Sequence, residues 1–174
     1  MGALQSIGTI NFEVYESGKN RLLGLASVEL PNFEYESVDM KGNGIAGTTS
    51  APICGNFGDL ELKLTWRNTE GATTKLLRHD KIDLSLYAAI SKADSGTGSL
   101  SVVQHKIETR VWPKSLNLGK LEPSATADGE TTFTVVTFNY KIDNKETMHF
   151  DRFNYILRVD GTDYSAVVRR TLGL

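Results

Sequence analysis

Apolar residues recur at every second position in several parts of the chain, with polar residues between them. A period of two places alternate side chains on opposite faces of a strand, so each such run predicts a strand with one buried face. The clearest apolar positions are Ile10, Phe12, Val14, Leu60, Leu62, Leu64, Trp66, Ile82, Leu84, Leu86 and Ala88.

Two later stretches, Val102–Trp112 and Thr131–Ile142, are rich in valine, threonine and aromatic residues, which favour half-buried pleated strands. The dipeptide Asp143-Asn144 follows the second stretch and precedes another apolar run, Met148–Val159, so it predicts a tight hairpin turn. The fold class expected is therefore mainly β with antiparallel pairing.

Helical signal is confined to two short segments. Thr74–His79 is long enough for about two turns, with Thr73 or Thr74 as its N-cap. Asp163 is positioned to cap a C-terminal segment with a small apolar stripe. That stripe is too small for an independent helix, so we expect it to dock on its own sheet or on a neighbouring protomer. Its residues are Tyr164, Val167, Val168 and Leu172.

The segment Lys41–Gly58 breaks the alternation and is predicted to be a long loop. Glycines and a proline are poorly suited to the inside of a sheet ladder. Loops of this length in a compact domain are usually functional or disordered. The residues in question are Gly42, Gly44, Gly47, Pro52, Gly55 and Gly58.

Length and composition indicate one domain over residues 1–174, with 40% hydrophobic residues to fill its core. The formal net charge of −2 disfavours a dedicated nucleic-acid-binding module. The longest apolar run, Leu22–Ala26, is far below the roughly 20 residues of a membrane span. Met1–Ser6 lack the features of a secretory signal, so we expect a cytoplasmic protein, or one released by lysis.

Motifs that carry catalytic chemistry are weak throughout. Gly42–Gly47 matches G-x-G-x-x-G, but no helix is predicted after it to hold a pyrophosphate. The histidines His79, His105 and His149 lack metal-ligand spacing, and the single Cys54 excludes an intrachain disulfide. We therefore expect no enzyme activity, no cofactor and no metal.

Charge is distributed unevenly, since residues 1–60 carry an excess of acidic side chains and residues 61–120 an excess of basic ones. Several glutamates alternate with apolar residues on predicted strands. This pattern indicates either one acidic face with a function or an ordinary solvated sheet surface. The glutamates concerned are Glu13, Glu29, Glu34 and Glu36.

Several motifs occur in the order found in a known family. Leu30-Pro31 is followed by the acidic strand and by the Gly-rich loop that contains Ala51-Pro52. Near the C-terminus, Val159–Asp163 precedes the basic segment and the final Gly173-Leu174. Over essentially its whole length the chain resembles the major tail tube protein family of contractile-tailed bacteriophages and related phage-tail-like bacteriocins.

This resemblance implies two packed antiparallel sheets that form a barrel-like sandwich, with one short flanking helix. It also implies hexameric rings whose inner strands make one continuous β-barrel, and a stack of rings inside a contractile sheath. The tube would penetrate the host envelope and conduct DNA without binding it specifically. Sheath, tape-measure and baseplate proteins are the implied partners. The implied locations are the virion tail and, during assembly, the host cytoplasm, without membrane anchoring.

Three hypotheses follow from this resemblance. The C-terminal residues dock on their own sheet or on a neighbour, the four glutamates line the lumen so that DNA slides past, and the Gly-rich loop orders against adjacent subunits. The competing function is a monomeric β-barrel that binds a ligand or carbohydrate, with Trp66 and Trp112 as candidate contacts. The loop residues of the third hypothesis are Gly42, Gly44, Ile45, Gly47, Pro52 and Gly55.

Overall fold

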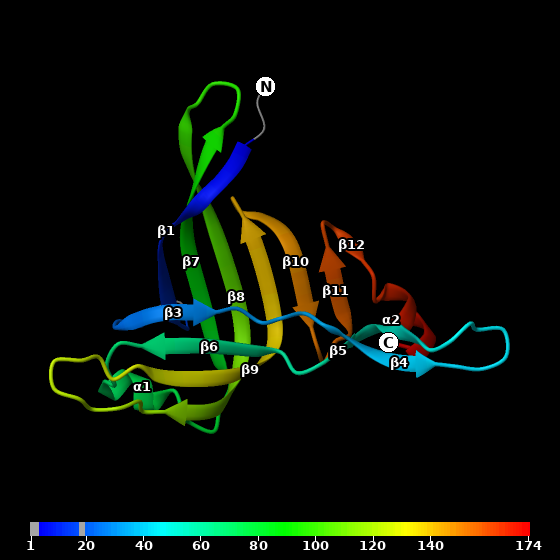
Figure 1. The fold of residues 1–174 in the computed structure, drawn as a ribbon, viewed down its shortest axis with the longest axis horizontal. Coiled ribbons are helices and arrows are strands. Elements are labelled where there is room, and N and C mark those ends of the chain that lie inside the picture. Colours follow the sequence, from blue (N-terminus) through cyan, green and yellow to red (C-terminus); the bar gives the residue numbers. More distant parts are fainter. Residues whose placement is uncertain (1–3, 18–19) are drawn as a thin grey trace.

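The computed structural model describes residues 4–17 and 20–174, and their fold is mainly antiparallel β (Figure 1). The main sheet follows the order β12-β11-β10-β9-β8-β7-β1-β2, and β6 joins β9 to β3. Its strands are β1 (Leu4–Glu16), β2 (Asn20–Arg21), β3 (Leu25–Glu29), β6 (Glu61–Trp66), β7 (Ile82–Asp94), β8 (Leu100–Asn117), β9 (Gly129–Ile142), β10 (Lys145–Asp151), β11 (Ile156–Val159) and β12 (Thr162–Asp163).

The remaining elements lie outside this sheet. Strands β4 (Tyr35–Met40) and β5 (Thr49–Phe57) form a separate two-stranded ribbon. The two helices are short: α1 (Gly71–Lys75) and α2 (Ala166–Leu172). No helix in the described part of the chain has the length and apolar character needed to span a membrane.

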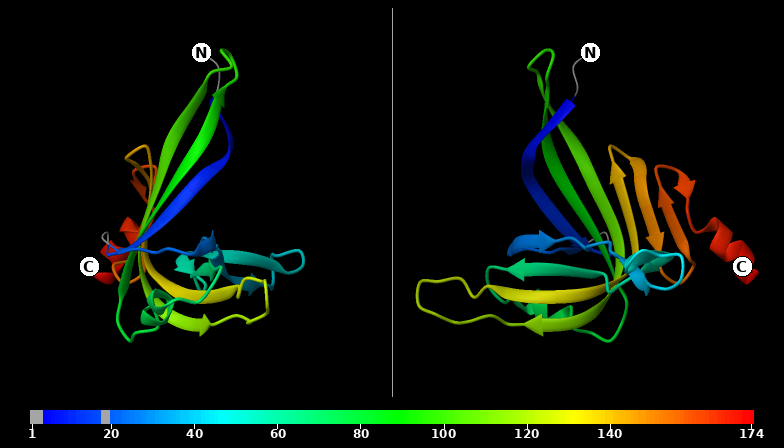
Figure 2. Two further views of the ribbon diagram at one scale, coloured as in Figure 1. Left: turned by 90° about the vertical axis from the view of Figure 1, so that its left-hand side faces the viewer. Right: turned by 45° about the vertical axis from the view of Figure 1, so that its right-hand side comes forward.

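Two layers of strands pack against each other, and β8 and β9 belong to both (Figures 1 and 2). The first half of β9 pairs with β6, and its second half pairs with β10. The β8–β9 register shifts between Arg110 and Val111, opposite the step from Thr137 to Val135, and shifts again between Pro113 and Ser115. Such bulges bend a strand and let it pass from one layer to the other.

The predicted fold class is confirmed, with a correction to its closure. Both hydrogen-bonded sheets are antiparallel, and the layers make a sandwich. The ten-stranded sheet is open, however, so a single chain does not close into a barrel. The two packed layers are also halves of one continuous sheet rather than two separate sheets.

The core lies between the layers and contains most of the apolar positions predicted from the alternation, although Ile10 on β1 is 59% exposed. Leu60, Leu62, Leu64, Ile82 and Leu84 are at most 1% exposed. Complete burial of such a side chain stabilises the fold by about 1.5–3 kcal/mol. The core also contains Val14, Trp66, Val111, Phe133 and Val135.

Trp66 is a core residue rather than a ligand contact. It is 1% exposed, and its Nε1 donates a 2.9 Å hydrogen bond to Oγ1 of Thr131, which is also buried. A buried indole N–H needs such a partner. The hypothesis of a binding module therefore loses one of its two candidate tryptophans.

The Asp143-Asn144 turn is confirmed. Both residues have positive φ, 50° and 63°, as a two-residue hairpin turn requires. Lys145 pairs with Ile142 across this turn.

The long loop predicted at Lys41–Gly58 is wrong in its second half, because Thr49–Phe57 is strand β5. Pro52 faces Ser37 in a ribbon whose outer edges are open, where a missing N–H costs no ladder bond. Gly55, at φ +81°, lies where several residues of β5 oppose Glu36 alone, so the glycine occupies an irregular bulge.

Both helices differ from their predicted limits. Helix α1 begins at Gly71 rather than Thr74, because the Glu70 N–H donates to Oγ1 of Thr73 and starts the turn earlier. Helix α2 begins only at Ala166, because Asp163 belongs to β12. Gly173 ends α2 in the left-handed conformation, at φ +76°. The interpretation of Met1–Ala3 in the N-terminal segment falls outside the described residues.

Candidate assembly interface

The main sheet has two unlike open edges. Strand β2 pairs only with Tyr15 and Glu16, so within the described residues no strand covers the outer edge of β1 from Leu4 to Val14. At the opposite end, β12 is two residues long and pairs only with β11. Open edges present unpaired N–H and C=O groups that another chain can pair with. Because the two edges differ, pairing between copies would be head-to-tail.

An arm of three strands projects beyond the two layers (Figures 1 and 2). It consists of the start of β1, the end of β7 and the start of β8, whose pairing extends to Leu4 opposite Asp94 and Ala93 opposite Leu100. At its tip, Oδ1 of Asp94 accepts hydrogen bonds from the N–H groups of Gly96 and Thr97. The arm carries large apolar side chains that are more than half exposed: Leu4, Ile7, Ile10, Leu100 and Val102.

The ribbon of β4 and β5 projects from another side of the molecule (Figure 1). An aromatic contact fixes its base, where Tyr35 stacks on Phe57 with ring centroids 4.5 Å apart. Of the predicted loop residues, the tip contains Gly42, Gly44, Ile45 and Gly47, while β5 contains Pro52 and Gly55. The ribbon also carries exposed apolar side chains: Val38, Met40 and Ile53.

Helix α2 presents its apolar stripe outward. Tyr164, Val167 and Leu172 are exposed, whereas Val168 is half-buried. Of the two docking sites expected for this segment, its own sheet therefore does not cover three of the four residues.

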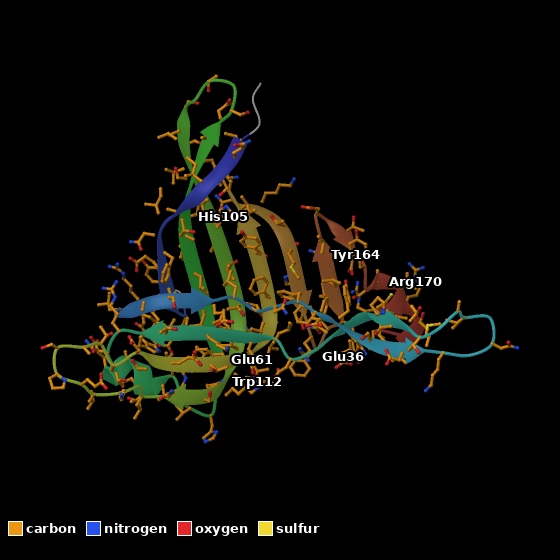
Figure 3. All side chains as sticks on the ribbon, in the orientation of Figure 1. Glu36, Glu61, His105, Trp112, Tyr164 and Arg170 are labelled. Carbon is orange, nitrogen blue, oxygen red and sulfur yellow. The ribbon has the colours of Figure 1, made fainter. Side chains whose placement is uncertain are left out.

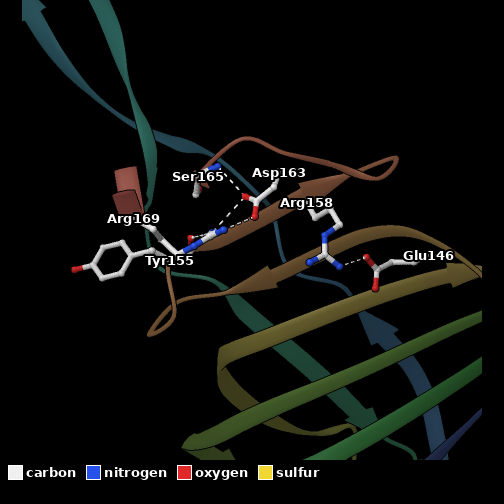
Figure 4. Close-up of polar contacts among 6 residues, drawn as sticks. All are labelled: Glu146, Tyr155, Arg158, Asp163, Ser165 and Arg169. Carbon is white, nitrogen blue, oxygen red and sulfur yellow. Dashed lines mark hydrogen bonds and ion pairs between the residues drawn. The ribbon is translucent and has the colours of Figure 1, made fainter. Parts of the chain in front are cut away.

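Two polar contacts hold α2 in place (Figure 4). Arg169 Nη2 donates to Oδ2 of Asp163 at 2.6 Å, and its Nη1 donates to the Tyr155 carbonyl at 2.7 Å. The hydrogen bond from Arg169 holds the pKa of Asp163 below its usual range. The helix is thus anchored by charge while its apolar residues stay free to contact another surface.

The four candidate glutamates do not share one face. Glu13 lies on β1 and pairs with Arg21. Glu29 is on β3 in the other layer, 3.7 Å from Lys63. Glu34 precedes β4, and Glu36 lies within it beside a cavity of about 280 Å³ (Figure 3). Of the two interpretations of the alternation, the single acidic face is therefore wrong, because Glu13, Glu29 and Glu36 lie on strands of different sheets and layers.

The polar face of the main sheet instead carries paired charges of both signs. Nζ of Lys106 and of Lys141 each lie 2.7 Å from a carboxylate oxygen of Glu108. Arg110 Nε donates to Asp83 at 2.8 Å. The hydrogen bonds from the two lysines lower the pKa of Glu108. Sequence reasoning missed this face, although the charges at every second position of residues 106–110 were a signal for it.

The residues considered for catalysis do not form a site. His105 contacts the Tyr140 hydroxyl, and burial lowers the pKa of its imidazole. Cys54 is exposed on β5. Among the described residues no group of three or more histidine, cysteine or acidic side chains is arranged to hold a metal ion.

Open sheet edges and projecting segments with uncovered apolar residues are features of a structural subunit built to contact other chains. The family comparison identifies which kind. The sequence model of the phage tail tube protein FII family matches residues 9–173, so the chain belongs to that family. The resemblance inferred from the sequence is thereby confirmed. Because this is a family of structural proteins, the expectation that the chain is not an enzyme is confirmed as well.

Solved structures agree in fold. The anti-feeding prophage tube-terminating cap has a TM-score of 0.55 and 14% identity, over 81% of this chain and 94% of that one. The sheath/tube terminator of the extracellular contractile injection system PVC, in its extended state, has a TM-score of 0.51 and 15% identity, over 78% of this chain and 96% of that one. No curated protein sequence matches the chain.

Proposed function

We propose that this chain forms hexameric rings that stack into the hollow tube of a contractile tail. The observation that carries the proposal is the pair of unlike open edges on the main sheet. Pairing β1 of one copy with the β12 side of the next extends a single sheet from copy to copy. A head-to-tail contact of this kind closes into a ring when its rotation allows.

The second layer belongs on the outside of such a ring. Strands β3 and β6, with the first half of β9, form the layer that covers one face of the layer containing β1, β7 and β10 (Figure 2). The outer circumference of a closed wall has more room for this layer than the inner one. The polar face, with Glu13, Glu108 and their paired cations, then lines the channel.

A lining of paired charges suits the passage of DNA. Each free lysine or arginine that contacts a phosphate adds favourable counterion release, and many such contacts along a tube would hold a polyanion back. On the polar face the cations Lys106, Lys141 and Arg110 already have carboxylate partners. In this proposal the tube penetrates the host envelope and conducts DNA without binding it specifically.

The remaining partners follow from the same role. The tube lies inside the sheath of a virion tail, contacts baseplate and tape-measure proteins, and is assembled in the host cytoplasm. Membership in the tube family supports this arrangement.

An edge variant tests the ring. Ile7 and Ile10 are exposed on the free edge of β1, and lysines there oppose edge pairing. The natural chain should give rings or tubes in negative-stain microscopy, whereas Ile7→Lys with Ile10→Lys should stay a folded monomer. Leu121→Lys, on the loop between β8 and β9, is the matched control and should assemble normally. Normal rings from the double variant would refute closure through this edge.

A further inference from the structure

A groove with an exposed tryptophan lies on the opposite end of the molecule from the arm. The segment between α1 and β7 and part of β8 line its volume of about 770 Å³. Trp112 is 46% exposed, and Leu77 is exposed beside it. The Trp112 ring lies 5.5 Å from that of Phe153, which is also exposed. The fold therefore leaves much of these apolar side chains uncovered, in contrast to the buried Trp66.

The proposed ring fixes the direction in which each end of the molecule points. Hydrogen bonds between strands run around the ring, so the strands themselves run along the tube, at a tilt of roughly 35–45°. The arm extends β7 and β8 toward one end, and Trp112 lies toward the other (Figures 1 and 3). The arm of each copy therefore points at the ring on one side, and the groove faces the ring on the other.

The arm tip and the groove match in chemistry. Leu100 and Val102 at the tip are 73% and 64% exposed, and the tip turn, residues 94–99, contains one charged residue, Asp94. The apolar residues that line the groove are Leu77, Trp112 and Pro113. Its charged lining residues are mainly basic, with Arg78, Lys81 and Lys114 against a single acid, Asp80.

One of these three cations is available to a new carboxylate. Arg78 pairs with Glu16, and Lys114 pairs with Asp59 and Glu61. Lys81 has no ion pair within residues 4–17 and 20–174. Its ammonium group can therefore take up the charge of Asp94 without breaking an existing contact.

We propose that the arm tip of one copy seats in the Trp112 groove of the next copy along the tube. This proposal rests on the proposed function, because it is the stacking of rings that brings the two ends together. Ring closure uses the β1 edge, and stacking uses the tip and the groove. The two contacts therefore involve different residues and can be disrupted separately.

Engineered disulfides test the contact directly. In a Cys54→Ser background, Leu100→Cys is combined with Leu77→Cys, and separately Val102→Cys with Pro113→Cys. A disulfide requires Cα atoms within about 7 Å, so only a seated tip is cross-linked on oxidation. At least one pair should give a ladder of linked chains longer than one ring. Leu100→Cys with Leu121→Cys, outside the groove, should give no ladder.

Replacing the Trp112 side chain by a methyl group tests how much this contact contributes to the stacking of rings. Trp112→Ala should leave rings intact and raise the subunit concentration at which tubes appear by about tenfold or more, the scale of a buried tryptophan hot spot. Leu121→Ala is the control and should leave that concentration unchanged.

The outcomes separate the two proposals. Tubes that form normally from Trp112→Ala, with no ladder from either cysteine pair, would overturn the seating of the arm and leave the ring in place. A natural chain that stays monomeric would overturn the proposed function, and the seating with it. Binding of a different protein to the groove on intact tubes, lost in the Trp112→Ala variant, would also overturn the seating of the arm.

Discussion

The outward-facing stripe of α2 offers a test in which assembly and folding can be measured apart. The change is Val167→Thr with Leu172→Gln, which replaces two exposed apolar side chains by polar ones of similar size. Val167 is 69% exposed and Leu172 is 56% exposed in the single chain. The folded monomer therefore gains little from them, and we expect its unfolding temperature to be nearly unchanged.

Assembly should respond strongly. Complete burial of a valine or leucine is worth about 1.5–3 kcal/mol, so covering the exposed part of these two adds about 2–4 kcal/mol per contact. This corresponds to a loss of about 30- to 1,000-fold in association. Sedimentation velocity over a concentration series measures this change. Thermal unfolding is measured in the monomeric Ile7→Lys, Ile10→Lys background, so that assembly does not contribute.

Val168→Thr provides the contrast, because Val168 is half-buried and its change should lower the unfolding temperature of the monomer. Unchanged assembly of the Val167→Thr, Leu172→Gln variant would refute the idea that α2 contacts a neighbour. A large fall in its monomer unfolding temperature would show instead that the stripe packs on its own chain in solution.

Four further predictions concern the channel, the acid response, the ribbon and the core. Glu108→Lys should leave tubes intact but slow DNA delivery in an infection assay, whereas Glu34→Lys, off the polar face, should not; equal delivery by both would refute the lining. Because its lysine partners lower the folded-state pKa of Glu108, its contribution to stability is present above the unfolded pKa of about 4.3 and is lost as the pH falls through the folded value. Glu108→Gln should therefore flatten the acid decline of the unfolding temperature, and an unchanged profile would contradict this. Deleting residues 44–47 shortens only the ribbon tip, so the subunit should fold normally but assemble poorly. Normal tubes from this deletion would count against a contact there. Trp66→Phe leaves the Thr131 hydroxyl without its partner and should cost about 1–3 kcal/mol in chemical denaturation, whereas a neutral result would show that this bond is dispensable.

The sequence predicted the strands that have one buried face and the acidic strand that contains Glu36, but it missed strand β5. Leu60–Trp66 alternates because β6 has the other layer of the sandwich on one side only. Phe57 is the one buried residue of β5, so no hydrophobic period marks this strand, and the glycines and proline of the ribbon suggested a loop. Hydrogen bonding between two chain segments, rather than burial, makes the ribbon.

The candidate interface was predictable in part for a similar reason. The stripe of Tyr164, Val167 and Leu172 could be read from local spacing, and its outward position supports the expected docking. The grouping of the glutamates could not be predicted from the sequence, because alternation indicates the face of a strand but not which strands are neighbours. Glu13 and Glu29 alternate in the same way and lie in different layers.

The passage of β8 and β9 through both layers has a mechanical consequence. In most sandwiches two layers can slide over each other by repacking side chains alone. Here a shear between the layers must stretch two continuous backbones and break the ladder around Val111 and Val135. A wall built from such subunits transmits an axial push through covalent chain and hydrogen bonds, so each subunit responds to load as one stiff piece.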